Sequence, residues 1–115
     1  MEHLVFAIET GGEVHAFANE RDAAAYIEAE DVLRNEYEIY LDDGTVVEAI
    51  VSQSGFLSPK IVALKDTDKQ RPDRLRQLLI QYLDRIDVEV GKDRDLSSLA
   101  QLVLSKVGPS WPAPS

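Results

Sequence analysis

The chain has 115 residues, of which 44% are hydrophobic and 29% are charged, with a formal net charge of -9 and no cysteine. This length suits one domain with a single core, and this composition is that of a folded protein. The lack of cysteine excludes disulfides, thiolate nucleophiles and cysteine-ligated zinc, and no apolar run reaches the roughly 20 residues of a membrane-spanning helix.

Charge is distributed unevenly along the chain. Residues 1–50 carry 13 acids and 2 bases, whereas residues 51–115 carry 8 acids and 10 bases. An acidic field repels phosphate backbones and anionic lipid heads, so direct binding of nucleic acid or of a membrane is disfavoured, and a basic protein partner is favoured. The first ten residues carry acids where a signal peptide would carry bases, so the cytoplasm is the expected compartment.

The beginning of the chain predicts a hairpin followed by a short helix. Two apolar runs, at residues 4–9 and 14–17, flank a Thr-Gly-Gly turn signal. A helix is expected over residues 20–30, with Asn19 as its N-cap and acids in its first turn.

Residues 36–52 contain the clearest hairpin, because two strand-like runs flank an Asp-Asp-Gly turn. Two turn geometries fit this sequence. A two-residue turn would place Glu48 opposite Ile39, whereas a three-residue loop with a bulge at Gly44 would set Glu38 opposite Glu48. The sequence leaves the register open.

The second half predicts one more strand and two helices. Residues 60–65 have the pattern of a strand. Apolar side chains recur at spacings of three and four over residues 72–86, which indicates an amphipathic helix. A final helix is expected over residues 96–107, capped by Asp93 or Asp95.

These elements predict a single α+β domain over residues 1–108. Its mainly antiparallel sheet would have four or five strands, with one short helix and two C-terminal helices packed on it. The proline-rich residues 109–115 are expected to form a flexible tail.

Few side chains suit catalysis. The chain has two histidines, His3 and His15, and a metal site formed by both with a carboxylate is geometrically possible if the first two strands pair. No HExxH-type spacing, Gly-x-Ser-x-Gly motif or glycine-rich phosphate loop accompanies them. The sequence therefore predicts a protein that is not an enzyme and needs no cofactor.

Seven acids lie close together in the sequence, between the end of the first helix and the tip of the second hairpin. They are Glu28, Glu30, Asp31, Glu36, Glu38, Asp42 and Asp43. A run of acids is most often a solvated face, but acids on one exposed surface also speed association with a basic partner and orient it. We interpret these residues as candidate partner-binding residues, provided that the arginines of residues 71–85 do not bind them internally.

Part of this region also resembles a known pattern. An aromatic residue, a short helix with Tyr-Ile-Glu, an Asp-Val pair, a Glu-Tyr strand and a turn follow one another through residues 17–46. The matching residues are Phe17, Tyr26, Ile27, Glu28, Asp31, Val32, Glu36, Tyr37, Asp42 and Gly44. This pattern resembles small uncharacterised bacterial proteins, some of which are thought to be immunity proteins encoded beside secreted toxins. The resemblance implies binding to a toxin and implies no catalytic residues.

The leading hypothesis is thus a non-enzymatic protein-binding domain, in its most concrete form an immunity protein that neutralises a basic, nuclease-like toxin through an acidic surface. A second hypothesis is a small regulatory or assembly subunit that docks through its C-terminal helices. A third is a metal-dependent hydrolase that uses His3 or His15.

Overall fold

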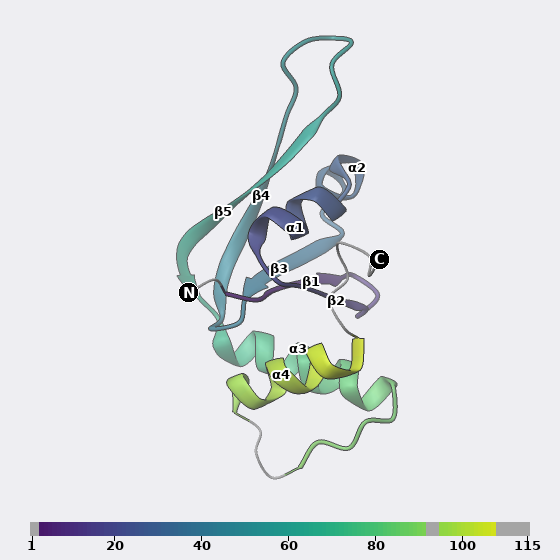
Figure 1. The fold of residues 1–115 in the computed structure, drawn as a ribbon, viewed down its shortest axis with the longest axis vertical. Coiled ribbons are helices and arrows are strands. Elements are labelled where there is room, and N and C mark those ends of the chain that lie inside the picture. The colour runs from purple at the N-terminus through teal and green to yellow at the C-terminus, as the bar shows by residue number, and fades with distance from the viewer. Residues whose placement is uncertain (1–2, 92–94, 108–115) are drawn as a thin grey trace.

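The computed structural model describes residues 3–91 and 95–107, apart from the side chains of Glu30 and Asp31. The strands and helices follow the order shown in Figure 1: β1 (Val5–Glu9), β2 (Val14–Phe17), α1 (Glu20–Tyr26), α2 (Ala29–Leu33), β3 (Tyr37–Leu41), β4 (Thr45–Ser52), β5 (Ile61–Gln70), α3 (Pro72–Arg85) and α4 (Leu96–Val107). All strand pairs are antiparallel and the strand order is β2-β1-β3-β4-β5. The predicted α+β fold class is confirmed, while the predicted tail at 109–115 lies outside the described residues.

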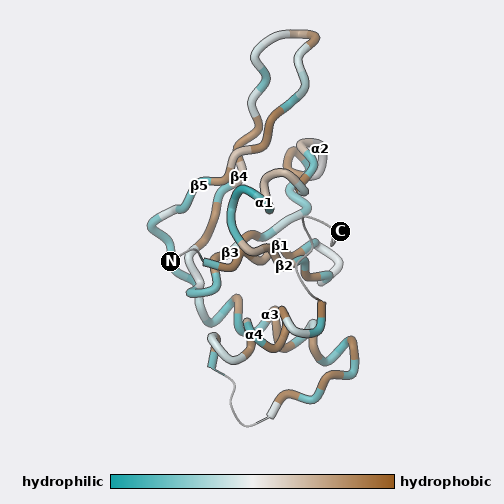
Figure 2. Tube along the Cα trace, in the orientation of Figure 1, coloured by the Kyte–Doolittle hydropathy of each residue, from teal (hydrophilic) through white to brown (hydrophobic). Residues whose placement is uncertain are grey.

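The sheet is covered on both faces. Successive side chains of a strand point to opposite faces, and in β1 Val5 and Ala7 pack with α1, whereas Phe6 and Ile8 pack with α3 and α4. Two separate cores result, one on each side of the sheet, and the hydropathy of the strands in Figure 2 reflects this double burial. The fold therefore has three layers, with α1 and α2 on one face and α3 and α4 on the other.

The helix predicted over residues 20–30 is interrupted. Asn19 caps α1 as expected, because its side-chain oxygen accepts a hydrogen bond from the backbone N–H of Asp22 at 2.8 Å. The chain then becomes extended at Ile27 (φ -71°, ψ 127°), whose side chain is buried in the core between α1 and the sheet. A second short helix, α2, follows at residue 29.

The two C-terminal helices agree closely with the prediction. Pro72 is the first residue of α3, a position where the missing N–H has no intrahelical partner to lose. The apolar stripe of α3 and one face of α4 close the second core, through Leu75, Leu78, Leu79 and Leu83 of α3 and Leu99, Ala100 and Val103 of α4. Asp95 is the residue that caps α4, because its Oδ2 accepts from the backbone N–H of Ser98 at 3.1 Å.

The turn between β3 and β4 is the three-residue alternative. Ile39 lies opposite Val47 and Tyr40 opposite Val46, which is the register of a three-residue loop. Gly44 has a φ of +92°, a region that favours glycine. The backbone N–H and the hydroxyl of Thr45 both donate to Asp43 Oδ1, at 2.9 and 2.7 Å, and this fixes the turn.

Strand β5 is longer than predicted. It continues past residue 65 through the charged segment DTDKQ to Gln70, which pairs with Thr45. A register shift between Thr45 and Val47 accommodates the extra residues, and Thr67 Oγ1 donates to the backbone carbonyl of Val46 there at 2.7 Å. Bulges and charged side chains are common at sheet edges, where they hinder unwanted strand pairing.

Candidate protein-binding surface

The hairpin of β4 and β5 extends beyond the rest of the molecule. Figure 1 shows this projection, which we call the arm and define as residues 49–63. Its last strand pair is Ser52 with Ile61, and the loop between them is held by its own hydrogen bonds. The side-chain amide of Gln53 donates to the carbonyls of Phe56 and Ser58, at 3.3 and 2.6 Å. The loop thus has a defined conformation.

Two large apolar side chains stand at the end of the arm almost fully in solvent. Phe56 is 96% exposed and Leu57 is 93% exposed; we call these two residues the tip. In Figure 2 hydrophobic colouring reappears at this end of the arm. Each exposed large apolar side chain orders water that burial would release, so the tip favours contact with another apolar surface.

Exposed apolar side chains are concentrated at the same end of the molecule. Among the described residues, seven large hydrophobic side chains are exposed, and six of them lie on the arm or on α1 and α2 beside it. These six are Tyr26, Leu33, Ile50, Phe56, Leu57 and Ile61. Clusters of this kind commonly mark interaction sites, whereas single exposed apolar residues do not.

The arm is exposed because the helical layers end before it does. On one side, α1 and α2 cover the base of the hairpin, where Ala49 and Val62 are partly buried. On the other side, the core beneath α3 and α4 extends along β4 only to Val46. Ile50 occupies the same face of β4 four residues further on and is 42% exposed.

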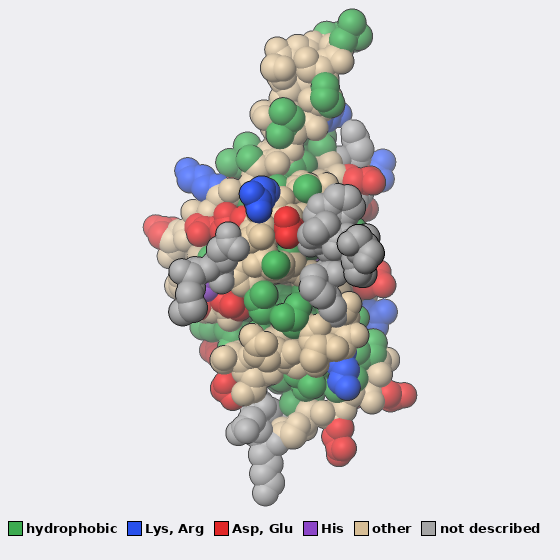
Figure 3. All heavy atoms as spheres, in the orientation of Figure 1, with side chains coloured by type: hydrophobic (Ala, Val, Ile, Leu, Met, Phe, Trp, Pro, Cys, Tyr) green, Lys and Arg blue, Asp and Glu red, His purple; other side chains and the backbone are tan. Residues whose placement is uncertain are grey.

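The arm is also uncharged over most of its length. Residues 49–59 contain no acid and no base, although 29% of the chain is charged, and Lys60 is the one charged residue between 49 and 63. The space-filling view in Figure 3 shows apolar and other uncharged side chains on the outer part of the arm, with the charged side chains on the body. A partner of the arm would therefore be recognised by shape and apolar contact.

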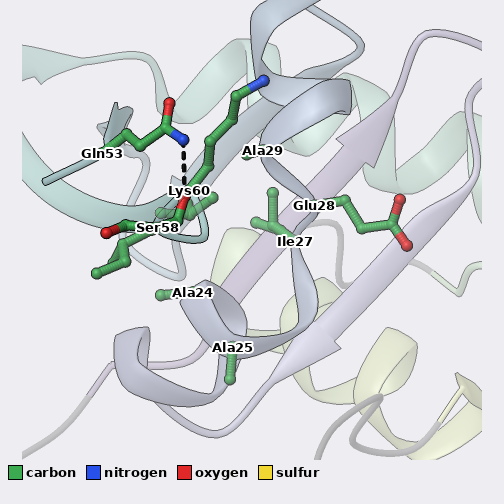
Figure 4. Close-up of a pocket in the computed structure, with 10 residues that line it drawn as sticks. Ala24, Ala25, Ile27, Glu28, Ala29, Gln53, Ser58 and Lys60 are labelled. Carbon is green, nitrogen blue, oxygen red and sulfur yellow. Dashed lines mark hydrogen bonds between the residues drawn. The ribbon is translucent and has the colours of Figure 1, made fainter. Parts of the chain in front are cut away.

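A groove of about 710 Å³ lies between the arm and the first two helices. Figure 4 shows its helical side, formed by alanines and Ile27, and its arm side, formed by Gln53, Ser58 and Lys60. The groove is lined by Ala24, Ala25, Ile27, Glu28, Ala29, Gln53, Ser58, Lys60, Ile61 and Val62. Because three of these side chains are alanines, they leave room for larger apolar side chains of another molecule.

The predicted acidic residues are divided between different parts of the molecule. Asp42 and Asp43 lie in the turn after β3, close to His3. Asp66 of β5 interacts electrostatically with His3 and with Glu20 of α1. A side-chain hydrogen bond with Asp66 is the main reason that the pKa of Glu20 is raised to about 7, and partial burial and the negative charge of Asp66 raise it further. This end of the molecule therefore has a concentrated negative field that includes two of the seven predicted residues.

The remaining predicted residues lie elsewhere. Glu38 faces α3, where it forms an ion pair with Arg74, and Glu28 borders the groove on the opposite face of the sheet. The backbone carbonyl of Glu36 accepts hydrogen bonds from Thr10. The side chains of the other two, Glu30 and Asp31, are outside the described residues. The described acids of this run do not form one continuous surface.

The two histidines belong to separate clusters. His3 Nδ1 lies 2.6 Å from Asp42 Oδ1, and this hydrogen bond is the main reason that the pKa of His3 is raised. His15 Nε2 lies 3.3 Å from Glu9 Oε2, and its ring packs against Tyr26 at a centroid distance of 5.3 Å.

Each histidine cluster offers ligands that could hold a metal ion. The groups are His3 with Asp42 and Asp43, and His15 with Glu9 and Glu13; in each, the ligand atoms lie within 4.8 Å of one another. Within the described residues the two histidines share no ligand group, because the pairing of β1 with β2 places His15 opposite Ala7, four residues along the chain from His3.

The candidate residues predicted from the sequence include neither Phe56 nor Leu57. The available signal was the segment SQSGFLSP, in which two large apolar residues interrupt a run of serine, glycine and proline. Such side chains have no helical or strand periodicity that would bury them.

Comparisons with protein-family models, with curated proteins and with solved structures gave no match. Within the described residues, none of the helices has both the length and the apolar character needed to cross a bilayer. The function of this chain is therefore inferred from its own geometry and chemistry.

Proposed function

We propose that this chain is a protein-binding domain without catalytic activity, and that the tip of its arm is the anchor. The observation that carries the proposal is the exposure of Phe56 and Leu57, 96% and 93%, at the end of a projecting hairpin. Protein interfaces obtain most of their affinity from a few large side chains that become fully buried on binding. Two such side chains presented in advance, on a loop with its own hydrogen bonds, meet this requirement.

The charge of the chain favours a basic partner. A net charge of -9 attracts cations over a distance of about 8–10 Å at physiological salt, which accelerates encounter with a basic protein and selects its orientation. Glu20, Asp42, Asp43 and Asp66 concentrate this field around His3. In this proposal the acids steer the partner and the uncharged arm anchors it.

The most concrete form of the proposal is an immunity protein that binds and neutralises a basic, nuclease-like toxin in the bacterial cytoplasm. The resemblance of residues 17–46 to such proteins supports this form, as does the acidic field. Neutralisation would be steric, since the arm would occupy the partner's surface while the acids face its basic groove.

Site-specific photo-crosslinking in the organism that encodes the chain tests the proposal. A benzophenone amino acid at position 56 should give adducts with a basic protein, and the same amino acid at Gln77, an exposed position of α3, should not. Increasing salt before irradiation should reduce the yield, because it screens the attraction.

The outcomes separate the two protein-binding hypotheses. Adducts from position 77 and none from position 56 would favour a regulatory or assembly subunit that docks through its C-terminal helices. No adduct from either position would remove the support for a protein-binding domain.

A further inference from the structure

The same chain carries a projecting apolar tip and a groove whose helical side is formed by alanines and Ile27. The tip extends from the far end of the arm, and the groove lies between α1 and α2 on one side and Gln53, Ser58 and Lys60 of the arm on the other (Figures 1 and 4). A protein that presents both parts of a complementary contact on one surface can pair with itself through a twofold axis, because each copy then supplies one tip and one groove.

We propose that a second copy of this chain occupies the groove, with the two arms antiparallel and each tip inserted into the groove of the other copy. Phe56 and Leu57 of one copy then contact Ala24, Ala25 and Ile27 of the other. This inference rests on the proposed function, because it names the first partner of the same tip and the means by which the tip is covered before another protein binds.

Charge permits this pairing at the arm and disfavours it over other surfaces. Two chains of net charge -9 repel each other, so their contact should be made where charge is lowest. Residues 49–59 have none. The charged residues that line the groove, Glu28 and Lys60, have opposite signs and add no net charge to the contact.

The exchanged tips supply only part of the area that a stable dimer needs. Two exchanged phenylalanine rings bury about 300–500 Å² together. A specific interface needs roughly 1,200–2,000 Å² in total, and the exposed side chains of Tyr26, Leu33, Ile50 and Ile61 beside the tip and groove supply further apolar area. Dimers should therefore dissociate on dilution, which leaves the tip accessible to a competing partner.

Sedimentation equilibrium of the full chain tests the pairing. The apparent mass should rise from 12.8 kDa towards twice this value as the concentration increases. Replacing both tip residues, Phe56→Ser with Leu57→Ser, should raise the dissociation constant at least about 30-fold. These side chains are exposed in the monomer, so the variant should keep its fold.

A groove variant and a matched control locate the contact. Ala25→Arg fills the groove and should weaken dimers as strongly as the tip variant does. Gln77→Arg adds the same charge at an exposed position of α3 and should leave the dissociation constant within about twofold. An added positive charge reduces the repulsion between two acidic copies, so electrostatics alone would tighten the Ala25→Arg dimer. A weaker dimer of this variant would therefore be caused by the filled groove.

Mixing the two variants gives the most specific result. A heterodimer of the tip variant with Ala25→Arg retains one intact tip in one intact groove, whereas either homodimer retains none. The mixture should therefore associate more tightly than either variant alone. Equal association of the mixture and the separate variants would overturn the exchange of arms, as would a wild-type chain that remains a monomer at every concentration.

Salt distinguishes this inference from the proposed function. Raising salt from about 0.05 to about 0.5 M should tighten self-association, because it screens repulsion between like charges, and should weaken capture of a basic partner. A monomeric chain that still crosslinks to a basic protein from position 56 would refute the dimer and leave the proposed function intact. A chain that dimerises but crosslinks to no other protein would refute the proposed function and leave the dimer intact.

Discussion

Arg74 of α3 binds Glu38 of β3 through two hydrogen bonds, from Nε to Oε1 at 3.3 Å and from Nη2 to Oε2 at 3.0 Å. The hydroxyl of Tyr40 also donates to Glu38 Oε1, at 2.8 Å. These contacts connect the C-terminal helical layer to the sheet. The arginine is the main cause of the lowered pKa of Glu38, so one of the acids predicted to bind a partner also connects the sheet to α3.

Removing this ion pair should destabilise the fold modestly. Arg74→Met should lower the free energy of unfolding by about 1 kcal/mol or less at pH 7, because both side chains are more than 40% exposed and water screens their attraction. The pKa of Glu38 is lower in the folded chain than its ordinary 4.5. The ion pair therefore stabilises the folded state fully above pH 4.5, and this stabilisation is lost as the pH falls through the folded pKa.

Urea titrations at pH 7 and pH 3 measure this difference. Arg76→Met is the matched control, because Arg76 pairs with Asp73, which is 91% exposed, and this pair should contribute almost nothing. An equal loss in both variants at pH 7 would contradict the role assigned to Arg74.

Gly44 is expected to tolerate no side chain. Its φ is +92°, and an added Cβ would lie 2.6 Å from Pro72 Cα, a backbone atom at the start of α3. Gly44→Ala should therefore cost more than about 2 kcal/mol, since the strain of positive φ and a clash with rigid backbone combine. Gly11→Ala is the control, because nothing lies within 4 Å of its added Cβ. Thermal unfolding of both variants tests this prediction, and similar midpoints would contradict it.

The carboxyl of Glu20 should make stability fall between acid and neutral pH. Asp66 raises the pKa of Glu20 from 4.5 to about 7. A carboxyl with a raised folded pKa stabilises the fold fully below its unfolded pKa, and this effect is lost as the pH rises through the folded value. Glu20→Gln should therefore reduce the fall in the unfolding midpoint between pH 5 and pH 8.

Two comparisons isolate this effect. Asp22→Asn removes another acid from the first turn of α1 and should leave the pH dependence as in wild type. Some dependence should persist in Glu20→Gln because of His3, whose pKa is raised chiefly by Asp42 and also by Asp43 and Asp66. Because the pKa of His3 is raised on folding, this histidine stabilises the folded state fully below pH 6.5, and the stabilisation is lost as the pH rises through the folded pKa. Identical profiles for wild type and Glu20→Gln would exclude the carboxyl pair as a cause.

The elements of the fold were predictable because local signals and burial agree there. In α3 the apolar spacing, the N-terminal proline and the burial of Leu79 all indicate one helix. The break at Ile27 was not predictable, because it depends on the position of a core that the sheet creates. The end of β5 was missed because its charged residues are typical of an exposed edge and have little apolar pattern.

The candidate site was less predictable than the fold. A sequence shows that Glu38 is acidic, but only the strand register and the helix packing bring Arg74 to it. Conversely, Phe56 and Leu57 look like core residues by type, and only the length of the hairpin beyond the helices leaves them in solvent. Exposure of a side chain depends on the ends of neighbouring layers, which local patterns do not encode.

The loop of the arm should be dispensable for folding. A two-residue Asn-Gly turn that replaces residues 53–60 would join Ser52 directly to Ile61, the last strand pair of the hairpin. The tip contributes almost no burial, and a shorter loop has a smaller closure entropy, so the free energy of unfolding should stay equal or rise. At the same time, self-association should be lost.

Chemical denaturation and sedimentation of the same sample check both halves of this prediction. Replacing only Ser54, an exposed loop residue, by alanine is the control for a change that leaves the tip in place. A shortened variant that unfolds much more easily would indicate that the loop supports the fold, and the exposed tip would then no longer imply binding. Retained stability with lost association would show that residues 53–60 serve recognition, because structure alone does not require them.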